Sequence, residues 1–423
     1  MRWFGPAIVV ICCAIAAWLG ATAIPRLGAG DAVSLAAGAT AIVAMGLALM
    51  LAARPRFAEP LFGGLDRMYR VHKWLGISAL ALMVLHYLVE LDFDERVRET
   101  RLGDLAGEIG EIAFFSFIAL ILLSWIKRIP AVRAELPYQW WRFSHRFMGI
   151  PFAGVALHQA LIDSPITWNA PLSLYLDAFC ILGLAAYLQT ELRGWTRRKW
   201  SFTVAGIARH GSATEITLKQ TGRAVMPWRP GQFAFFSAPE AGLSEPHPFT
   251  IASAPRPDGS MTLAVKSLGD WTGRLPRALQ PGSTVTAEGP YGRFTFRKGP
   301  RAQLWLAGGI GITPFLAWAE SLGAADGGDI HLVLCVTRAE EAIGLDVLQQ
   351  AAARNPRFSF RIVASDRDGR LSAQDLVTNT PFRIAGAEMS FCGPVALKEG
   401  IVKGLIELGQ APRSLRFEHF AFR

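Results

Sequence analysis

The stretch VHKWLGISALALMVLHYLVEL, residues 71–91, places two histidines in a segment that is otherwise mostly apolar and long enough to cross a bilayer. His72 and His86 are 14 residues apart. In an α-helix this spacing gives a rise of ~21 Å and turns one side chain only ~40° from the other. Because ionisable side chains in lipid are costly and usually face a bundle interior, we expect both imidazoles to project inward from one helix face.

A second histidine pair occupies residues 145–163, another mainly apolar segment. His145 and His158 are 13 residues apart, which an ideal helix would set ~140° apart, but Pro151 between them can kink the helix. Haem iron with two axial imidazoles suits such pairs. We therefore expect two b-type haems, an inner one on His72 and His145 and an outer one on His86 and His158. The alternative, four satisfied core imidazoles, is disfavoured by the double pairing.

Hydropathy predicts an all-α bundle of six membrane helices in the first half of the chain. The expected spans are 4–24, 33–53, 71–91, 109–126, 145–163 and 170–188. Residues 54–73 and 127–146 carry five basic residues each, whereas 91–108 holds six acidic residues against three arginines. By the positive-inside rule the basic connections face the cytoplasm, so both termini of this multi-pass protein should lie inside.

Composition narrows the classes of partner. The 423 residues carry a net charge of +9, but the basic residues cluster beside apolar spans, which favours a lipid bilayer and not a nucleic acid as the partner. The five cysteines lack the spacing of a plant-type iron–sulfur cluster. We divide the chain into a membrane domain at 1–192, a β-barrel domain at 199–298 and an α/β domain at 299–423.

The expected β-barrel is antiparallel, because short β-rich runs at 201–207, 215–219, 232–237 and 261–265 alternate with Gly and Pro turns. Within it, the run His247-Pro248-Phe249-Thr250-Ile251-Ala252-Ser253 resembles the flavin-binding signature of the ferredoxin-reductase fold, in the form found in NADPH oxidases and ferric reductases. The resemblance implies that this run binds FAD, with His247, Thr250 and Ser253 in contact with the flavin. A plain β-turn is the alternative.

A second run, residues 266–272, is similar to the pyrophosphate segment of the same family. Its sequence KSLGDWT offers a glycine for close backbone approach and the start of a helix with free N–H groups. The residues expected to bind the cofactor here are Lys266, Gly269 and Thr272.

The rest of the chain alternates strands and helices and predicts a doubly wound parallel sheet. Its first strand leads into Gly308-Gly309-Ile310-Gly311-Ile312-Thr313-Pro314, where glycines permit a tight turn and a helix start can receive a dinucleotide pyrophosphate. Gly308, Gly309, Gly311, Thr313 and Pro314 are therefore candidates for binding NADPH or NADH. Arg338, after the second strand, could meet a 2′-phosphate and favours NADPH.

The end of the chain adds two further candidates by resemblance. The run Cys392-Gly393-Pro394 resembles the family motif beside the nicotinamide, which implies a catalytic position for Cys392. A terminal aromatic residue shields the flavin ring in the family, and Phe422 is the expected one, with Phe420 as an alternate. The alternative for both phenylalanines is a last edge strand with core side chains.

Together these features resemble a bacterial NADPH-oxidase-like protein of the inner membrane over nearly the whole chain. The resemblance implies electron transfer from cytosolic NAD(P)H through FAD and two haems to a small-molecule acceptor, with oxygen and superoxide expected first. A ferric or cupric chelate reductase stays open, because the acidic segment 92–108 could gather cations, and so does a cytochrome that donates to a periplasmic protein. We expect no obligatory cytosolic activator, since no EF-hand pattern is present.

Overall fold

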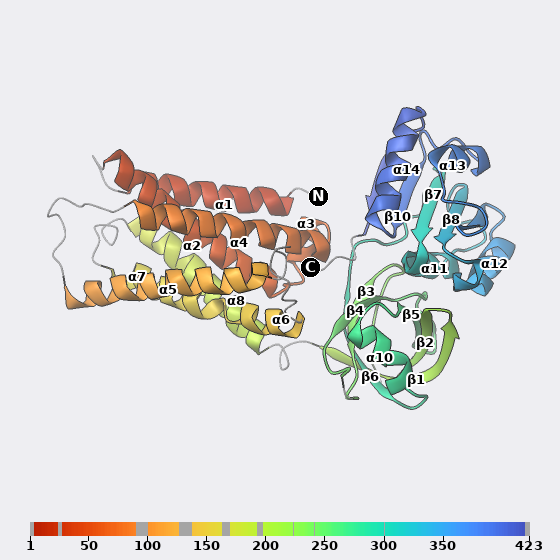
Figure 1. The fold of residues 1–423 in the computed structure, drawn as a ribbon, viewed down its shortest axis with the longest axis horizontal. Coiled ribbons are helices and arrows are strands. Elements are labelled where there is room, and N and C mark those ends of the chain that lie inside the picture. The colour runs from red at the N-terminus through yellow and green to blue at the C-terminus, as the bar shows by residue number, and fades with distance from the viewer. Residues whose placement is uncertain are drawn as a thin grey trace. The chain divides into compact units, whose positions relative to one another are not determined.

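The computed structural model describes residues 4–23, 28–89, 100–126, 138–162, 170–192, 198–222, 224–240, 242–299 and 301–418. The chain forms two compact units, residues 1–196 and 197–423. The first is helical, and the second contains two β-sheets with helices (Figure 1).

Helices make up the first unit. They are α1 (Phe4–Ala21), α2 (Ala29–Ala52), α3 (Ala58–Phe62), α4 (Leu65–Leu88), α5 (Arg101–Ile126), α6 (Tyr138–Arg146), α7 (Gly149–Leu161) and α8 (Ala170–Glu191). In the described part of the chain, α1, α2, α4, α5 and α8 are long and apolar enough to cross a membrane. Helix α2 is rich in Ala and Gly, packs against α1, α4 and α8, and is the most buried of the five. Small residues permit such close helix packing.

The expected span at 145–163 differs in the structure, so the six-span bundle is not confirmed. Helix α6 ends at Arg146, a turn occupies Phe147 and Met148, and α7 starts at Gly149. Pro151 lies in the first turn of α7, where its missing N–H is not needed. The turn at 147–148, and not a kink at Pro151, therefore separates His145 from His158.

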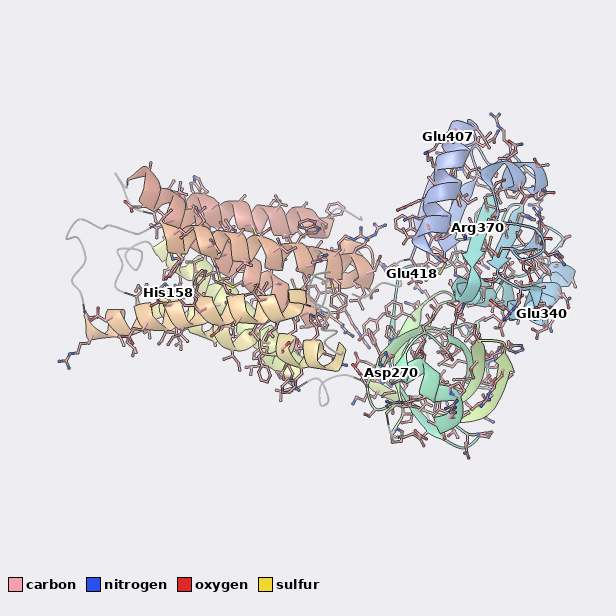
Figure 2. The ribbon with its side chains drawn as sticks, in the orientation of Figure 1. His158, Asp270, Glu340, Arg370, Glu407 and Glu418 are labelled. Atoms are coloured by element: carbon pink, nitrogen blue, oxygen red, sulfur yellow. The ribbon has the colours of Figure 1, made fainter. Side chains whose placement is uncertain are left out.

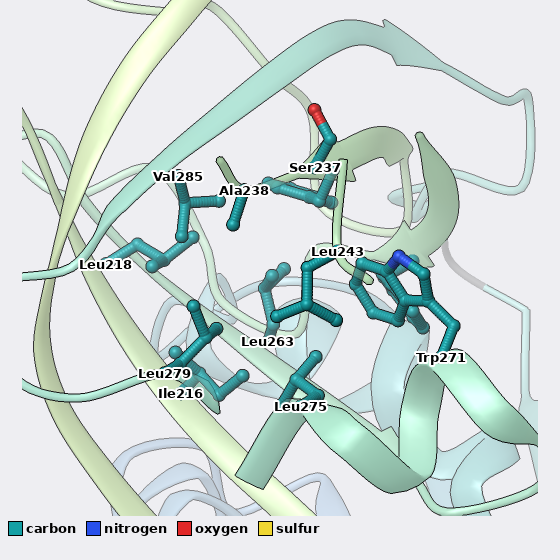
Figure 3. Close-up of a pocket in the computed structure, with 12 residues that line it drawn as sticks. Ile216, Leu218, Ser237, Ala238, Leu243, Leu263, Trp271, Leu275, Leu279 and Val285 are labelled. Atoms are coloured by element: carbon teal, nitrogen blue, oxygen red, sulfur yellow. The ribbon is translucent and has the colours of Figure 1, made fainter. Parts of the chain in front are cut away.

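A six-stranded antiparallel sheet with the order β4-β3-β6-β1-β2-β5 begins the second unit. Its strands are β1 (Lys199–His210), β2 (Ala213–Gln220), β3 (Phe233–Ser237), β4 (His247–Thr250), β5 (Ser260–Lys266) and β6 (Thr284–Tyr291). A single antiparallel bridge joins Ile251, just after β4, to Leu263 of β5, so the two edges of the sheet meet there. Apolar side chains of the strands and of α10 (Asp270–Ala278) surround a small interior cavity, as Leu218, Leu263, Leu275 and Trp271 show in Figure 3.

A five-stranded parallel sheet with the order β11-β10-β7-β8-β9 follows, as the alternating pattern predicts. Its strands are β7 (Gln303–Gly308), β8 (Ile330–Val336), β9 (Phe358–Ala364), β10 (Glu388–Cys392) and β11 (Ser414–Phe417), and its helices are α11 (Thr313–Glu320), α12 (Leu345–Arg354), α13 (Ala373–Asn379) and α14 (Val395–Glu407). Residues of α11 and α12 share one buried cluster with the sheet, and residues of α13 and α14 share another. The strand order reverses between β7 and β10, the place where such sheets bind ligands.

Aromatic side chains connect the antiparallel and parallel sheets. Trp318 of α11 donates a hydrogen bond from Nε1 to Pro230 O at 3.1 Å and packs 4.8 Å from the ring of Phe294. Gly231 has a φ of +91°, and a Cβ at that position would lie 2.1 Å from Phe294 O. The Pro230-Gly231 turn therefore needs glycine for both its conformation and its close contact.

Candidate functional sites

His72 of α4 and His145 of α6 lie close together, with ring centroids 6.1 Å apart and ring planes inclined at 77° to each other. His72 Nδ1 lies 2.8 Å from Ala48 O of α2. A carbonyl only accepts hydrogen bonds, so Nδ1 carries the proton and Nε2 keeps its lone pair. Trp141 stacks on His145 at 5.2 Å, while His145 Nδ1 is buried with no hydrogen-bond partner among the described residues.

This geometry fits two axial ligands of one haem. Two imidazoles on opposite sides of a metal ion, each bonded at about 2 Å, have ring centres roughly 6 Å apart. The Nδ1–H bond of His72 to a backbone carbonyl is the contact that commonly orients a metal-binding histidine and leaves Nε2 for the metal. The inner pair expected from sequence is thus brought together.

His86 of α4 and His158 of α7 have the same kind of anchor (His158 is labelled in Figure 2). His86 Nδ1 lies 3.0 Å from Ser34 O of α2, and His158 Nδ1 lies 2.8 Å from Ala106 O of α5. Because a carbonyl only accepts, each Nδ1 donates to it and each Nε2 is left for another partner. His86 Nδ1 also lies 3.0 Å from Ser34 Oγ. Sequence reasoning missed these acceptors, because a backbone carbonyl leaves no residue signature.

The expected flavin run, residues 247–253, begins with β4, an edge strand of the antiparallel sheet, and continues into the loop after it. Thr250 is only 4% exposed, and its Oγ1 has no hydrogen-bond partner in the described structure. Such a group is costly unless a ligand completes it, so this hydroxyl fits a flavin-binding role. The rings of His247 and Phe249 lie 4.7 and 5.3 Å from Trp271. Pro248 lies between them on the same strand.

Ser253 has a structural role in this conformation. Its side chain is fully buried, its Oγ accepts from Thr262 N–H at 3.0 Å, and its carbonyl accepts from Trp228 Nε1 at 3.1 Å. A flavin contact by Ser253 stays a prediction.

The expected pyrophosphate segment forms the start of α10. Thr272 Oγ1 accepts from the N–H groups of Leu268 and Gly269 at 2.9 and 3.0 Å, so this hydroxyl caps the helix. A Cβ at Gly269 would meet no described atom within 4 Å, which leaves the backbone approachable. Lys266 ends β5 directly before this turn.

The two glycine-containing turns of the parallel sheet pack backbone against backbone where the strand order reverses. A Cβ at Gly311 would lie 2.2 Å from Cys392 O, and one at Gly308 would lie 2.6 Å from Pro394 Cδ. Gly309 and Gly393 have φ values of +53° and +156°. Only glycine suits these positions, and the result is two turns of backbone groups side by side at the point where such sheets bind ligands.

Helix α11 begins directly after the first of these turns. Thr313 and Pro314 form its first turn, and the Thr313 hydroxyl donates to Ile310 O at 3.1 Å. The helix N-terminus thus points its free N–H groups at the turn where a pyrophosphate was expected.

Cys392 is fully buried at the end of β10, and burial together with nearby Glu418 raises the pKa of its thiol well above the ordinary value. The thiol is therefore neutral at physiological pH. Glu418 N–H donates to Phe391 O at 3.4 Å, so the chain leaves β11 beside this turn. Phe420 and Phe422 lie outside the described residues.

Arg338 follows β8 with a largely exposed side chain. Its guanidinium forms an ion pair with Glu341 at 3.3 Å. It therefore stands one strand away from the glycine turn after β7, with a competing carboxylate beside it.

Comparisons with known proteins match two separate parts of the chain. Residues 37–156 match the family described as ferric reductase like transmembrane component, and residues 208–295 match an FAD-binding domain. The toluate 1,2-dioxygenase electron transfer component of Pseudomonas putida is 28% identical over 218 residues, 50% of this chain and 64% of that protein. A superoxide-generating NADPH oxidase heavy chain of Dictyostelium discoideum is 24% identical over 231 residues, 50% of this chain and 41% of that protein.

Among solved structures, a flavohemoglobin from Malassezia yamatoensis aligns with a TM-score of 0.50 and 16% identity, covering 99% of this chain and 98% of that one. This is a likeness of fold alone. The chain spans less than two thirds of the length of the two relatives named above. With its apolar helices and its FAD-binding and nucleotide-binding folds, the chain is an integral membrane protein that joins a ferric-reductase-like transmembrane component to an FAD-binding domain, in the manner of NADPH oxidases.

Proposed function

We propose that this protein carries electrons from cytosolic NAD(P)H through FAD and two bis-histidine b-type haems across the membrane to molecular oxygen, which becomes superoxide. The observation that carries the proposal is the His72–His145 pair, whose rings stand 6.1 Å apart on separate helices. In the described structure, neither ring pairs with a carboxylate that would account for two histidines lying so close together.

The chain's own residues bind and orient the redox groups. The proposed holders of the haems are His72 with His145 and His86 with His158. When bound, FAD accepts a hydride and passes its two electrons on singly, and haem iron carries one electron at a time. One NADPH and two oxygen molecules then give NADP⁺, a proton and two superoxide ions.

The cofactor assignments in the second unit rest on the glycine turns where the strand order reverses and on β4. We assign the flavin to the β4 run with Thr250, and the dinucleotide to the turn Gly308–Gly309–Gly311 beside Cys392. Phe422, with Phe420 as the alternate, is the proposed shield of the flavin ring. The proposed domains are 1–192, 199–298 and 299–423, with both termini in the cytoplasm of a bacterium.

An anaerobic absorbance spectrum of the detergent-purified chain with haem and FAD tests this proposal. NADPH should produce the sharp bands of reduced bis-histidine haem, and air should abolish them while superoxide is trapped. A protein that binds no haem would contradict the membrane part of the proposal. Haem that reduces but stays reduced in air would contradict oxygen as the acceptor.

A chelate reductase is the second candidate. Asp104, Glu108 and Glu111 are exposed on α5, the helix that also supplies the acceptor for His158. Carboxylates on the proposed outer side would attract ferric or cupric chelates. Ferric-chelate reduction that persists without oxygen, and that falls when Asp104 and Glu108 become Asn and Gln, would favour this function over the oxidase.

A further inference from the structure

The two histidines of the proposed outer pair rest on their neighbouring helices in the same way. His158 Nδ1 lies 2.8 Å from Ala106 O, and Gly110 stands four residues further along α5. His86 Nδ1 lies 3.0 Å from Ser34 O, and Gly38 stands four residues further along α2. Each imidazole therefore lies across one helical turn, between the carbonyl of residue i and the α-carbon of residue i+4.

Helix geometry shows how the second position comes to need glycine. The carbonyl of residue i points along the axis towards residue i+4, so a ring that donates to it can lie directly over residue i+4, as both of these rings do. A Cβ at Gly110 would lie 2.5 Å from His158 Nδ1 and 2.9 Å from its Cγ and Cε1. A Cβ at Gly38 would lie 3.0 Å from His86 Nδ1. Neither ring can retreat without lengthening its hydrogen bond.

The inner pair lacks this arrangement. His72 donates to Ala48 O, and the residue four positions later in α2 is Ala52, which carries a Cβ. The glycine at i+4 is thus particular to the outer level of the bundle and does not follow from the carbonyl contact alone.

We propose that Gly38 and Gly110 are positioning residues for the outer haem, because they let the two axial imidazoles sit against the helix backbones in one fixed orientation. This inference rests on the proposed function in requiring haem at His86 and His158. The inference goes beyond the proposed function because it requires a glycine on each of two helices, α2 and α5, that supply no haem ligand.

The chain offers a matched control on the same helix. Gly107 lies one turn before Gly110 in α5, and a Cβ there would meet no described atom within 4 Å beyond its own turn of helix. Gly107→Ala and Gly110→Ala raise helix propensity equally, so a difference between them reports the contact with His158. His158→Ala identifies the signal of the outer haem.

The experiment compares the full-length purified variants by haem content and by the low-spin ferric signals in electron paramagnetic resonance. Gly107→Ala should keep two haems per chain and both signals. Gly110→Ala should lose or shift the signal that His158→Ala loses, with one haem per chain at the limit, while the other signal is unchanged. Gly38→Ala should shift the same signal by less, because its contact is longer.

Two haems and unchanged signals in both Gly110→Ala and Gly38→Ala would overturn the inference. If Gly110→Ala fails to fold, Gly38→Ala decides alone, and an unshifted outer signal in that variant would also overturn it. A wild-type chain that binds no haem would instead contradict the proposed function, so the two failures are distinguishable.

Discussion

Glu320, the last residue of α11, accepts hydrogen bonds from Arg256 Nε at 2.8 Å and from Ala254 N–H at 2.9 Å, one on each carboxylate oxygen. Ala254 directly follows the β4 flavin run, and α11 begins at the glycine turn of the parallel sheet. One carboxylate thus ties the loop after the proposed flavin run to the helix that starts at the glycine turn proposed for the dinucleotide.

Glu320→Gln should slow hydride transfer from NADPH to FAD several-fold, because one charge-assisted contact between the two binding regions weakens. Stopped-flow flavin reduction without oxygen measures this rate. Asp375→Asn is the matched control, because Asp375 forms a bidentate pair with Arg361 at 2.9 and 3.1 Å away from that interface. Each variant should lose about 1 kcal/mol of stability. Equal flavin-reduction rates in both variants would mean that Glu320 is only structural.

Thr250→Val should weaken FAD binding about tenfold and should not destabilise the apoprotein. The buried Thr250 hydroxyl has no partner in the described structure, so its removal relieves a desolvation cost of about 1–3 kcal/mol in the apo form while removing a contact to bound flavin. FAD titrations and apo melting temperatures measure the two effects. Thr380→Val is the control, because Thr380 Oγ1 donates to Leu376 O at 2.6 Å and should lose stability without any change in FAD affinity.

Acid should destabilise the α/β part through His331. Its side chain is buried in β8 with Nδ1 2.8 Å from Ser359 Oγ, and burial and the Arg361 charge lower its pKa to about 4 from 6.5. Below pH 6.5 the unfolded chain binds a proton that the folded chain refuses. The stabilisation present above that pH is therefore lost as the pH falls towards 4, by about 3 kcal/mol.

Urea unfolding of wild type and His331→Gln between pH 4 and pH 8 measures this contribution (the range is roughly that over which His titrates). The variant should show a flatter dependence of the unfolding free energy on pH. Parallel curves would assign the acid sensitivity to other groups.

Arg338→Ser should lower the ratio of kcat/KM for NADPH to that for NADH about tenfold, through loss of a charge near the expected 2′-phosphate. Glu341→Gln should raise the same ratio, since it removes the carboxylate that pairs with Arg338 at 3.3 Å. Opposite shifts in the two variants are the expected pattern. A ratio that neither variant changes would place the 2′-phosphate elsewhere.

Hydrophobic periodicity was sufficient to predict most of the helices and strands, because each apolar run only has to bury one face against a neighbouring element. The start of α4 shows the limit. The run of apolar residues predicted that the helix starts at residue 71, but it begins at Leu65. Gly63 and Gly64 directly precede it, and their φ values of +78° and +139° separate α3 from α4. The glycine pair was a usable signal, whereas the turn at Phe147 and Met148 has no such marker.

The same limit applies to the site residues. Histidines and glycine turns were predicted because the residue type itself, an imidazole or the lack of a side chain, indicates the role. The carbonyls of Ser34, Ala48 and Ala106 were not found, because any residue supplies a carbonyl and only packing selects which one is used. The internal hydrogen bonds of Ser253 and Thr272 were missed because their donors are backbone N–H groups, which almost any residue supplies.

Helix α2 holds both histidines of α4, with Ala48 O on His72 and Ser34 O on His86. Fourteen residues separate the acceptors, and fourteen separate the rings. Losing one residue between the acceptors would rotate one of them by ~100° and shift it by ~1.5 Å relative to the other. Over evolutionary time a substitution within the interval leaves this spacing unchanged, but an insertion or deletion in one helix survives only with its counterpart in the other.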